Sequence, residues 1–408
     1  IDIRSLNWIG KIMQWLIDGV GIVGLGVVVF TLILKTVVLP LDAYSRIKTK
    51  KQSLIMKEMR PQMEKLQKQY ANDKQMYSQK VMELQKANGY SMFGACIPMI
   101  VSLVIFMVVF SAFSTYSQYA NLSTYNNMVE EYNASVTAYV LTTSDGKTAH
   151  EDGFLIEVKD ETAGGVSYKI EYNKFKENKT ADYEIPENFD TLPEESTTDE
   201  NGKVVYGKNY YVESYVRLHA RQASADYYRS NKKKNKTSFI WVGNIWYPDS
   251  MLNKEIPSFS KFSSSVSRAI GTGVDASYED SYNEVMFNLS KEQKTYNGYF
   301  VLIVLAIGLM FLQQFIMNRS QKDAAELGSV DGSAAKTNKW MMIMMPVIYG
   351  VFSFFYSAAF SIYMITNTTY GLITTLIINK ITETRFAKQI ASGQFNKKRD
   401  KNRKRLKK

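Results

Sequence analysis

The sequence predicts an all-α polytopic membrane protein with five transmembrane helices, its amino end outside and its carboxyl end in the cytoplasm. Two observations indicate this fold class: apolar residues gather in five long runs, and basic residues are concentrated in particular connecting segments. A helix of about 20 mostly apolar residues spans the hydrocarbon core of a bilayer. The alternative, buried helices of a large soluble protein, is disfavoured by five charge-poor runs of this length. The predicted spans are residues 20–41, 93–116, 299–317, 340–357 and 358–379.

The distribution of charge predicts the orientation of these spans. Segment 42–92 has eleven Lys or Arg against five Asp or Glu, and the tail 380–408 has twelve against two. Segment 117–296 has twenty against twenty-seven. Loops rich in Lys and Arg stay in the cytoplasm, whereas long segments cross the membrane regardless of charge. We therefore place 42–92, the loop 318–339 and the tail in the cytoplasm, and the long acidic segment outside.

Two helical elements are predicted outside the spans. Residues 1–19 form an amphipathic helix in the outer interface, with Trp8 and Trp15 at the level of the lipid headgroups. Residues 42–92 form a basic hairpin of two antiparallel helices, because apolar residues recur every three or four positions on either side of an interruption at 71–73.

The outer part of the chain has a different composition, rich in Tyr, Thr, Asn and Ser. Residues 117–236 are predicted to form a β-rich or α+β insert between the second and third spans, and 237–298 a return segment. Strand patterns cover 136–143, 154–158, 166–172 and 204–212, turn signals lie at 145–146, 164–165 and 201–202, and a helical pattern covers 212–232.

Lys35 is the only charged residue in the five predicted spans. It lies five residues before Pro40, where the first apolar run ends, and Thr31 is one turn away on the same helix face. A charge inside the membrane is costly and marks a functional site unless the side chain reaches the interface. Two interpretations remain open: the ammonium extends to headgroups or water at the membrane end, or it lies in a water-filled cavity.

Polar but uncharged residues in the last three spans are candidates for the wall of such a cavity. They can equally form hydrogen bonds between packed helices. The candidates for a wet groove facing Lys35 are Thr31, Gln313, Gln314, Ser353, Tyr356, Ser361, Tyr363 and Thr366.

Methionines are frequent in the predicted hairpin. Because the methionine side chain adapts to varied apolar partners, Met59, Met63, Met76 and Met82 are candidates for capturing changing clients. Packing between the two hairpin helices explains the periodic positions more simply.

The basic tail predicts binding to polyanions. Nine of the twelve residues from Lys397 to Lys408 are Lys or Arg, a density typical of disordered segments that bind ribosomal RNA or anionic lipid. DNA is not an expected partner. The residues singled out are Lys397, Lys398, Arg399, Arg403, Lys404 and Arg405.

The sequence shows no catalytic site, metal site or cofactor site. His150 and His219 are the only histidines, and Cys96 is the only cysteine, which is too few for a metal cluster or a catalytic dyad. A Gly-rich phosphate loop of the P-loop type is not found. The start at Ile1 is compatible with removal of a signal peptide or a lipid anchor.

Several short motifs, in their order and spacing, resemble the YidC/Oxa/Alb family of membrane protein insertases, and this resemblance covers more than half of the chain. Lys35 followed by Pro40-Leu41 belongs to the pattern, as does the outer stretch from Phe239 to Asp249. The other motifs are Gly-Ala-Cys-Ile-Pro-Met (94–99), Asn-Gly-Tyr-Phe (297–300), Leu-Gln-Gln (312–314), Met-Met-Pro-Val (344–347) and Ile-Tyr-Met-Ile-Thr (362–366).

The resemblance implies a multi-pass protein of the bacterial cell membrane that is an energy-independent insertase and not an enzyme. It implies a groove open to the cytoplasm and the lipid, closed toward the outside, with one positive charge in the first conserved span. Nascent membrane proteins and lipid are the implied partners, with the Sec translocon and the ribosome as further candidates. A secondary transporter, or a receptor or assembly scaffold acting through the outer segment, are the alternatives.

Two features depart from the family pattern. The family usually has arginine where Lys35 stands, and lysine offers a point charge in place of a planar, bidentate fork. The insert at 117–236 replaces what is expected to be a short connection.

Overall fold

The computed structural model describes residues 1–88, 92–159, 166–270, 274–326 and 333–394. The chain is mostly helical, with few strands, and divides into two compact units. We call the first the insert unit and the second the bundle unit. The insert unit comprises Ile1–Arg4, Gln118–Lys234 and Lys254–Thr295, and the bundle unit comprises Ser5–Ser117, Asn235–Asn253 and Tyr296–Lys408.

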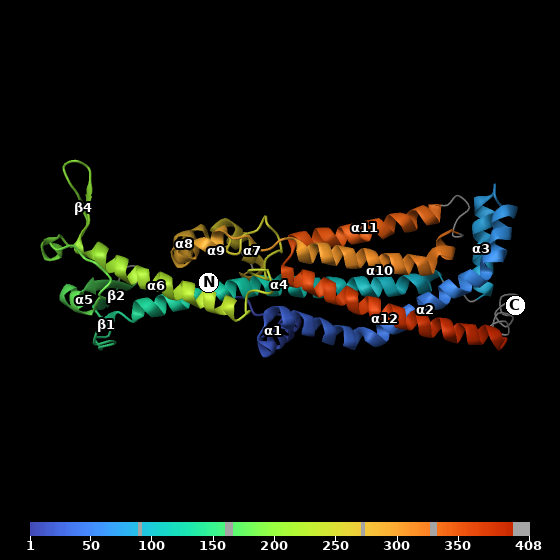
Figure 1. Ribbon diagram of the computed structural model, residues 1–408, viewed down its shortest axis with the longest axis horizontal. Coiled ribbons are helices and arrows are strands. Elements are labelled where there is room, and N and C mark those ends of the chain that lie inside the picture. Colours follow the sequence, from blue (N-terminus) through green and yellow to red (C-terminus); the bar gives the residue numbers. More distant parts are fainter. Residues whose placement is uncertain (89–91, 160–165, 271–273, 327–332, 395–408) are drawn as a thin grey trace. The chain divides into compact units, whose positions relative to one another are not determined.

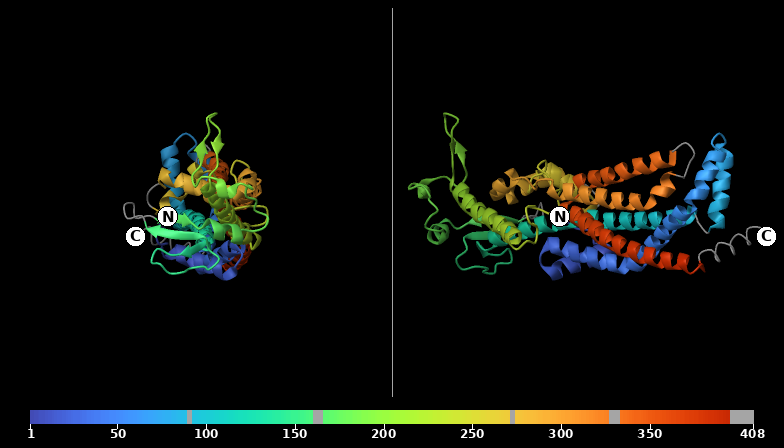
Figure 2. Two further views of the ribbon diagram at one scale, coloured as in Figure 1. Left: turned by 90° about the vertical axis from the view of Figure 1, so that its left-hand side faces the viewer. Right: turned by 45° about the vertical axis from the view of Figure 1, so that its right-hand side comes forward.

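The bundle unit is built from long helices, of which α2, α10 and α12 lie side by side (Figures 1 and 2). Among the described residues, two helices are long and apolar enough to cross a membrane, at Val23–Gln69 and Val301–Arg319. The other three spans stay predictions. The helices of this unit are α1 (Trp8–Val20), α2 (Val23–Gln69), α3 (Lys74–Ala87), the first part of α4 (Met92–Thr137), α10 (Val301–Glu326), α11 (Ser333–Phe355) and α12 (Ala358–Ala391).

Helix α2 continues past the point where its apolar run ends. Pro40 and Pro61 both lie inside this helix, although each proline removes one backbone hydrogen bond. Helix α2 packs extensively on α12. The two helices run in the same direction, because Arg46 contacts Thr375 and Lys50 contacts Glu383 farther along both.

The predicted hairpin and its interruption are confirmed. Helix α2 ends at Gln69, and α3 begins after Asp73, whose side chain accepts a hydrogen bond of 2.9 Å from the N–H of Met76. This is an N-cap, which satisfies one of the free N–H groups at a helix start. The hairpin core consists of Ile55, Met56, Met59, Met63, Tyr77, Val81 and, from α12, Phe386.

A tight turn joins the last two helices, as expected from the adjoining bounds of the predicted spans 340–357 and 358–379. Helix α11 ends at Phe355, and α12 begins at Ala358. Ser357 in this turn accepts a hydrogen bond of 2.9 Å from the hydroxyl of Ser117 in α4. The turn is therefore tied to a third helix of the bundle unit.

The insert unit combines helices with two small sheets. Strand β2 pairs parallel with β1 and antiparallel with β3. The predicted strands near 140, 156 and 168 are confirmed. The fourth predicted strand, 204–212, is confirmed only at Val204–Val205, because helix α6 begins after Gly207. The turn signal at 164–165 lies outside the described residues. The elements are the rest of α4, β1 (Val140–Thr142), β2 (Leu155–Lys159), β3 (Val166–Ile170), α5 (Tyr172–Asn178), η1 (Phe189–Thr191), β4 (Thr197–Thr198), β5 (Val204–Val205), α6 (Lys208–Lys233), α7 (Phe259–Ile270), η2 (Ala276–Tyr278), α8 (Glu279–Val285), η3 (Phe287–Leu289) and α9 (Ser290–Lys294).

The insert unit has two hydrophobic cores, and α6 contributes to both. One, the sheet core, contains Val140, Phe154, Leu155, Phe175, Phe189, Val212, Tyr215 and Val216. The other, the helical core, contains Leu122, Tyr125, Met128, Ala225, Tyr228, Ile256, Phe259, Phe262, Val266, Val274, Tyr282, Val285, Met286 and Leu289.

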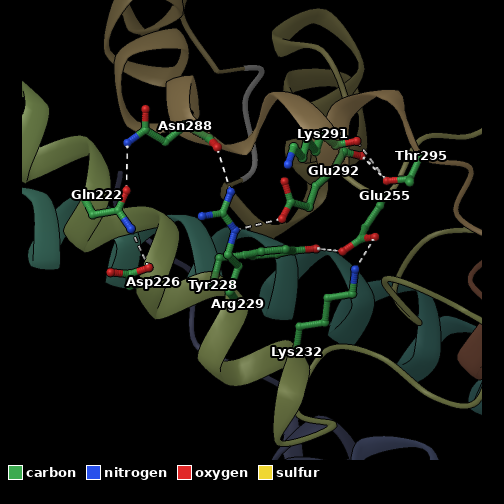
Figure 3. Close-up of polar contacts among 10 residues, drawn as sticks. All are labelled: Gln222, Asp226, Tyr228, Arg229, Lys232, Glu255, Asn288, Lys291, Glu292 and Thr295. Atoms are coloured by element: carbon green, nitrogen blue, oxygen red, sulfur yellow. Dashed lines mark hydrogen bonds and ion pairs between the residues drawn. The ribbon is translucent and has the colours of Figure 1, made fainter.

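Polar contacts also hold α6 to the segment that follows it (Figure 3). Arg229 Nε lies 2.9 Å from Glu292 Oε1. The buried carboxylate of Glu255 accepts hydrogen bonds from the Tyr228 hydroxyl at 3.0 Å and from Lys232 Nζ at 2.7 Å.

Candidate functional site

The site is best built from Lys35, whose side chain is largely buried on α2. Its exposed fraction is 16%, and its Nζ lies 3.5 Å from Oδ2 of Asp42. The two residues are seven apart, which places their Cα atoms about 10 Å apart along the helix axis. The side chains of Lys35 and Asp42 must therefore extend toward each other. The Lys35 ammonium lies toward the C-terminal end of the apolar run, where it pairs with the Asp42 carboxylate.

Arg46 continues the same group of charges. Its Nη2 lies 3.7 Å from Asp42 Oδ2, and its Nη1 donates a hydrogen bond to the hydroxyl of Thr375 on α12. Residues 35, 42 and 46 are spaced by seven and four, so they share one face of α2. Two cations and one carboxylate leave one net positive charge at this place.

Gly371 on α12 lies near polar groups of two other helices. A Cβ atom added there would lie 3.4 Å from Arg46 Nη2 and 3.5 Å from Gln313 Nε2. Gln313 of α10, a predicted groove residue, therefore lies on the same side of α12 as Arg46. Gln314 is half-buried on the same helix.

Small hydroxyl residues follow the buried face of α12 at intervals of seven. This spacing returns to the same helix face after two turns, and it includes the residue that binds Arg46. Small side chains permit close packing of neighbouring helices, which fits the packing of α12 on α2. The residues are Ser361, Thr368, Thr375 and Thr382, all buried.

The other predicted groove residues have varied surroundings. Thr31 is fully buried and donates to the carbonyl of Val27 at 2.7 Å, so its hydroxyl is satisfied within its own helix. Thr366 does the same with the carbonyl of Ile362 at 2.9 Å.

Two predicted serines and two predicted tyrosines differ from these threonines. Ser353 and Ser361 are fully buried, and their hydroxyls have no hydrogen-bond partner among the described residues. Tyr356 and Tyr363 pack on aromatic rings of α4. The centroid distances are 4.4 Å for Phe110 with Tyr356 and 5.2 Å for Phe113 with Tyr363.

Sequence reasoning missed Asp42 and Arg46. We took Pro40 as the end of the first span, which assigned both residues to the cytoplasmic segment. Their spacing from Lys35 was the available signal, because it places all three on one face if the helix continues. The structure shows that it continues.

The predicted client-capture methionines fall into two groups. Met59 and Met63 are buried in the hairpin core, so the packing interpretation is confirmed for them. Met76 and Met82 on α3 are 37% and 42% exposed and remain candidates for contact with clients. The basic residues from Lys397 to Arg405 lie outside the described residues.

Comparison with known proteins identifies a family for most of these elements. The family model described as 60Kd inner membrane protein matches residues 15–145 and 228–385, more than half of the chain. The match includes Lys35, Asp42 and Arg46. It leaves residues 146–227 unmatched, and these contain most of the sheet core.

Curated relatives are similar over shorter stretches. A membrane protein insertase YidC of Fusobacterium nucleatum is 36% identical over 91 residues, which is 22% of this chain and 42% of the relative. One from Caldanaerobacter subterraneus is 29% identical over 116 residues, which is 28% of this chain and 54% of the relative. The chain thus spans less than two thirds of the length of these relatives. No solved structure gives a significant match.

Proposed function

Because the chain belongs to the 60Kd inner membrane protein family, a family of bacterial inner-membrane proteins, we propose that it inserts nascent membrane proteins into that membrane. Its relatives are named membrane protein insertases. The observation that carries the proposal is the family match across α2, which carries Lys35, and across α10 and α12, which pack against α2. The proposal includes five spans with the amino end outside, and it includes insertion with or without a translocon.

Insertion requires a hydrophilic client tail to cross hydrocarbon without exposing its backbone polar groups to lipid. We propose a hydrated groove beside α2, walled by the polar residues of α10, α11 and α12, which shortens the apolar path. The net positive charge beside Lys35 favours tails that carry Asp or Glu. Burial of the client's apolar helix in lipid then drives its release.

The test is charge reversal at Lys35. Lys35→Glu places a second carboxylate beside Asp42, so the group becomes net negative and should repel acidic tails. We expect insertion of an acidic-tailed client into proteoliposomes to fall about tenfold, while Lys35→Arg retains it. Lys50→Glu reverses the same charge on the same helix, in a pair with Glu383, and should not discriminate between acidic and neutral tails. Undiminished insertion by Lys35→Glu would contradict the role of this residue.

We also propose that the basic tail binds the ribosome. A segment with nine basic residues in twelve neutralises phosphates, and such binding weakens steeply as salt rises. Truncation after Phe395 should reduce co-sedimentation with ribosomes at low salt. Unchanged co-sedimentation, together with loss of binding to anionic vesicles, would favour lipid as the tail's partner instead.

A further inference from the structure

Asp42 lies between two cations of its own helix. Its Oδ2 is 3.5 Å from Lys35 Nζ and 3.7 Å from Arg46 Nη2. The three side chains are 16%, 16% and 18% exposed, which means that each is largely buried but reachable. A carboxylate held by two cations can lose one of them and keep the other.

We propose that Asp42 is an internal counter-ion of Lys35 that the carboxylate of an acidic client replaces. This inference rests on the proposed function and adds a specificity-determining residue to it. The incoming carboxylate pairs with the Lys35 ammonium, and Asp42 keeps its pair with Arg46. When the client leaves, Asp42 pairs with Lys35 again.

Arg46 makes this exchange energetically feasible. Leaving a largely buried carboxylate without any partner is strongly unfavourable. Arg46 remains as a partner of Asp42 when Lys35 pairs with the client. The position of Arg46 does not depend on Lys35, because the Arg46 guanidinium donates to the Thr375 hydroxyl on α12. An exchange of one partner therefore leaves no charge of the group unpaired.

The arrangement also predicts selectivity. A neutral tail gains nothing from the ammonium and leaves the Lys35–Asp42 pair intact. An acidic tail gains a charged contact but must compete with Asp42 for it. Removal of the Asp42 charge should therefore increase the preference for acidic over neutral tails.

The experiment uses the full chain in proteoliposomes and two single-span clients that differ by one Asp→Asn change in the translocated tail. Asp42→Asn should raise the ratio of acidic to neutral insertion about twofold to fivefold, the upper part of the range for one solvent-accessible ion pair. Glu383→Gln is the matched control. It removes the same charge from the Lys50–Glu383 pair of 2.6 Å on the same two helices and should leave the ratio unchanged. An equal ratio in the two variants would overturn the inference.

A second measurement needs no substitution. A membrane-permeant carbodiimide activates the Asp42 carboxylate, and the Lys35 amine then displaces the urea and forms an amide, which mass spectrometry detects. A stalled acidic-tailed client should lower the yield of this link, whereas the neutral-tailed client should not. Equal yields with both clients would overturn the inference alone. Insertion no better than in empty vesicles would overturn the proposed function with it.

Discussion

Asp249 is a fully buried carboxylate that holds the start of α10. Its Oδ1 accepts a hydrogen bond from the N–H of Tyr299 and its Oδ2 from that of Leu302, both at 2.7 Å. N–H groups at a helix start have no partner within the helix. Asp249→Ala should therefore destabilise the bundle unit by about 1 to 3 kcal/mol, measured by denaturant unfolding in detergent micelles.

Asp275 provides the control for this prediction. It accepts a hydrogen bond of 2.8 Å from the N–H of Ser277 at the start of a short turn, but it is exposed. Asp275→Ala should cost less than about 1 kcal/mol. Equal losses in the two variants would contradict a special role for Asp249. Gly298→Ala should resemble Asp249→Ala, because its Cβ would overlap the Asp249 carboxylate.

Single residues were predictable where composition alone marks them. Lys35 was evident because it is the only charge in its apolar run. Its partner Asp42 depends on the helix continuing through Pro40, which local sequence disfavours and packing on α12 permits. Likewise, sequence cannot tell that the Thr31 hydroxyl is satisfied by the carbonyl of Val27 and so is not free to line a groove.

At the scale of elements, an ion pair joins α6 to α8. Arg221 donates to both carboxylate oxygens of Glu284, at 2.8 and 2.6 Å. Tyr132 donates to Glu284 as well, and burial raises the pKa of this tyrosine to about 12. The hydrogen bonds from Arg221 hold the pKa of the Glu284 carboxyl below its ordinary value.

This lowered pKa predicts how the packing of α6 on α8 depends on pH. The unfolded carboxyl binds protons at higher pH than the folded one, so its contribution is present above the ordinary glutamate pKa. It is lost as pH falls through the lower, folded value. Hydrogen exchange of α6 and α8 in the full chain should therefore become faster on acidification, beyond the intrinsic change in exchange rate. Glu284→Gln should weaken that dependence.

The exposed pair of Arg217 with Glu213, also on α6, is the control. Its side chains are 55% and 57% exposed, and its atoms are 3.4 Å apart. Exposed pairs contribute little to stability, so Glu213→Gln should leave the pH dependence of exchange unchanged. The same weakening in both variants would show that net charge, and not the pair with Arg221, controls the effect.

Elements were predictable where periodicity and turn residues agree. The hairpin interruption at 71–73 has both signals. The segment after Val204 has β-branched and aromatic residues that favour a strand, yet most of it lies in α6. Val212, Tyr215 and Val216 point into the sheet core, and this spacing fits a helix as well. A short apolar run cannot decide between the two.

At the scale of the whole molecule, the part of the chain that the family model leaves unmatched is nearly the part that forms the sheet core. Residues 146–227 are unmatched, whereas both flanking stretches are matched and supply all of the helical core except Ala225. The predicted insert, 117–236, is therefore larger than the unmatched part. A deletion of 120–235 would remove Leu122 and Tyr228 from the helical core and expose the apolar residues that remain.

A shorter deletion can test whether the sheet core is needed for insertion. The rings of Tyr139 and His219 lie 5.9 Å apart, and each ring is several ångströms from its backbone. We therefore replace residues 139–219 by a linker of about eight residues, which spans up to about 27 Å. This removes the whole sheet core and leaves the helical core complete. We expect the shortened chain to insert clients into proteoliposomes at the wild-type level.

The control is the deletion of 120–235, which should fail by aggregation because five of the fourteen buried residues of the helical core are lost. A receptor or scaffold that acts through its outer part predicts the opposite for the shorter deletion, namely a folded chain without function. Size-exclusion chromatography separates these cases, because it reports folding independently of insertion. A monodisperse 139–219 deletion that inserts no client would move the essential activity from the bundle unit to the sheet core, and the role of Lys35 would then need another explanation.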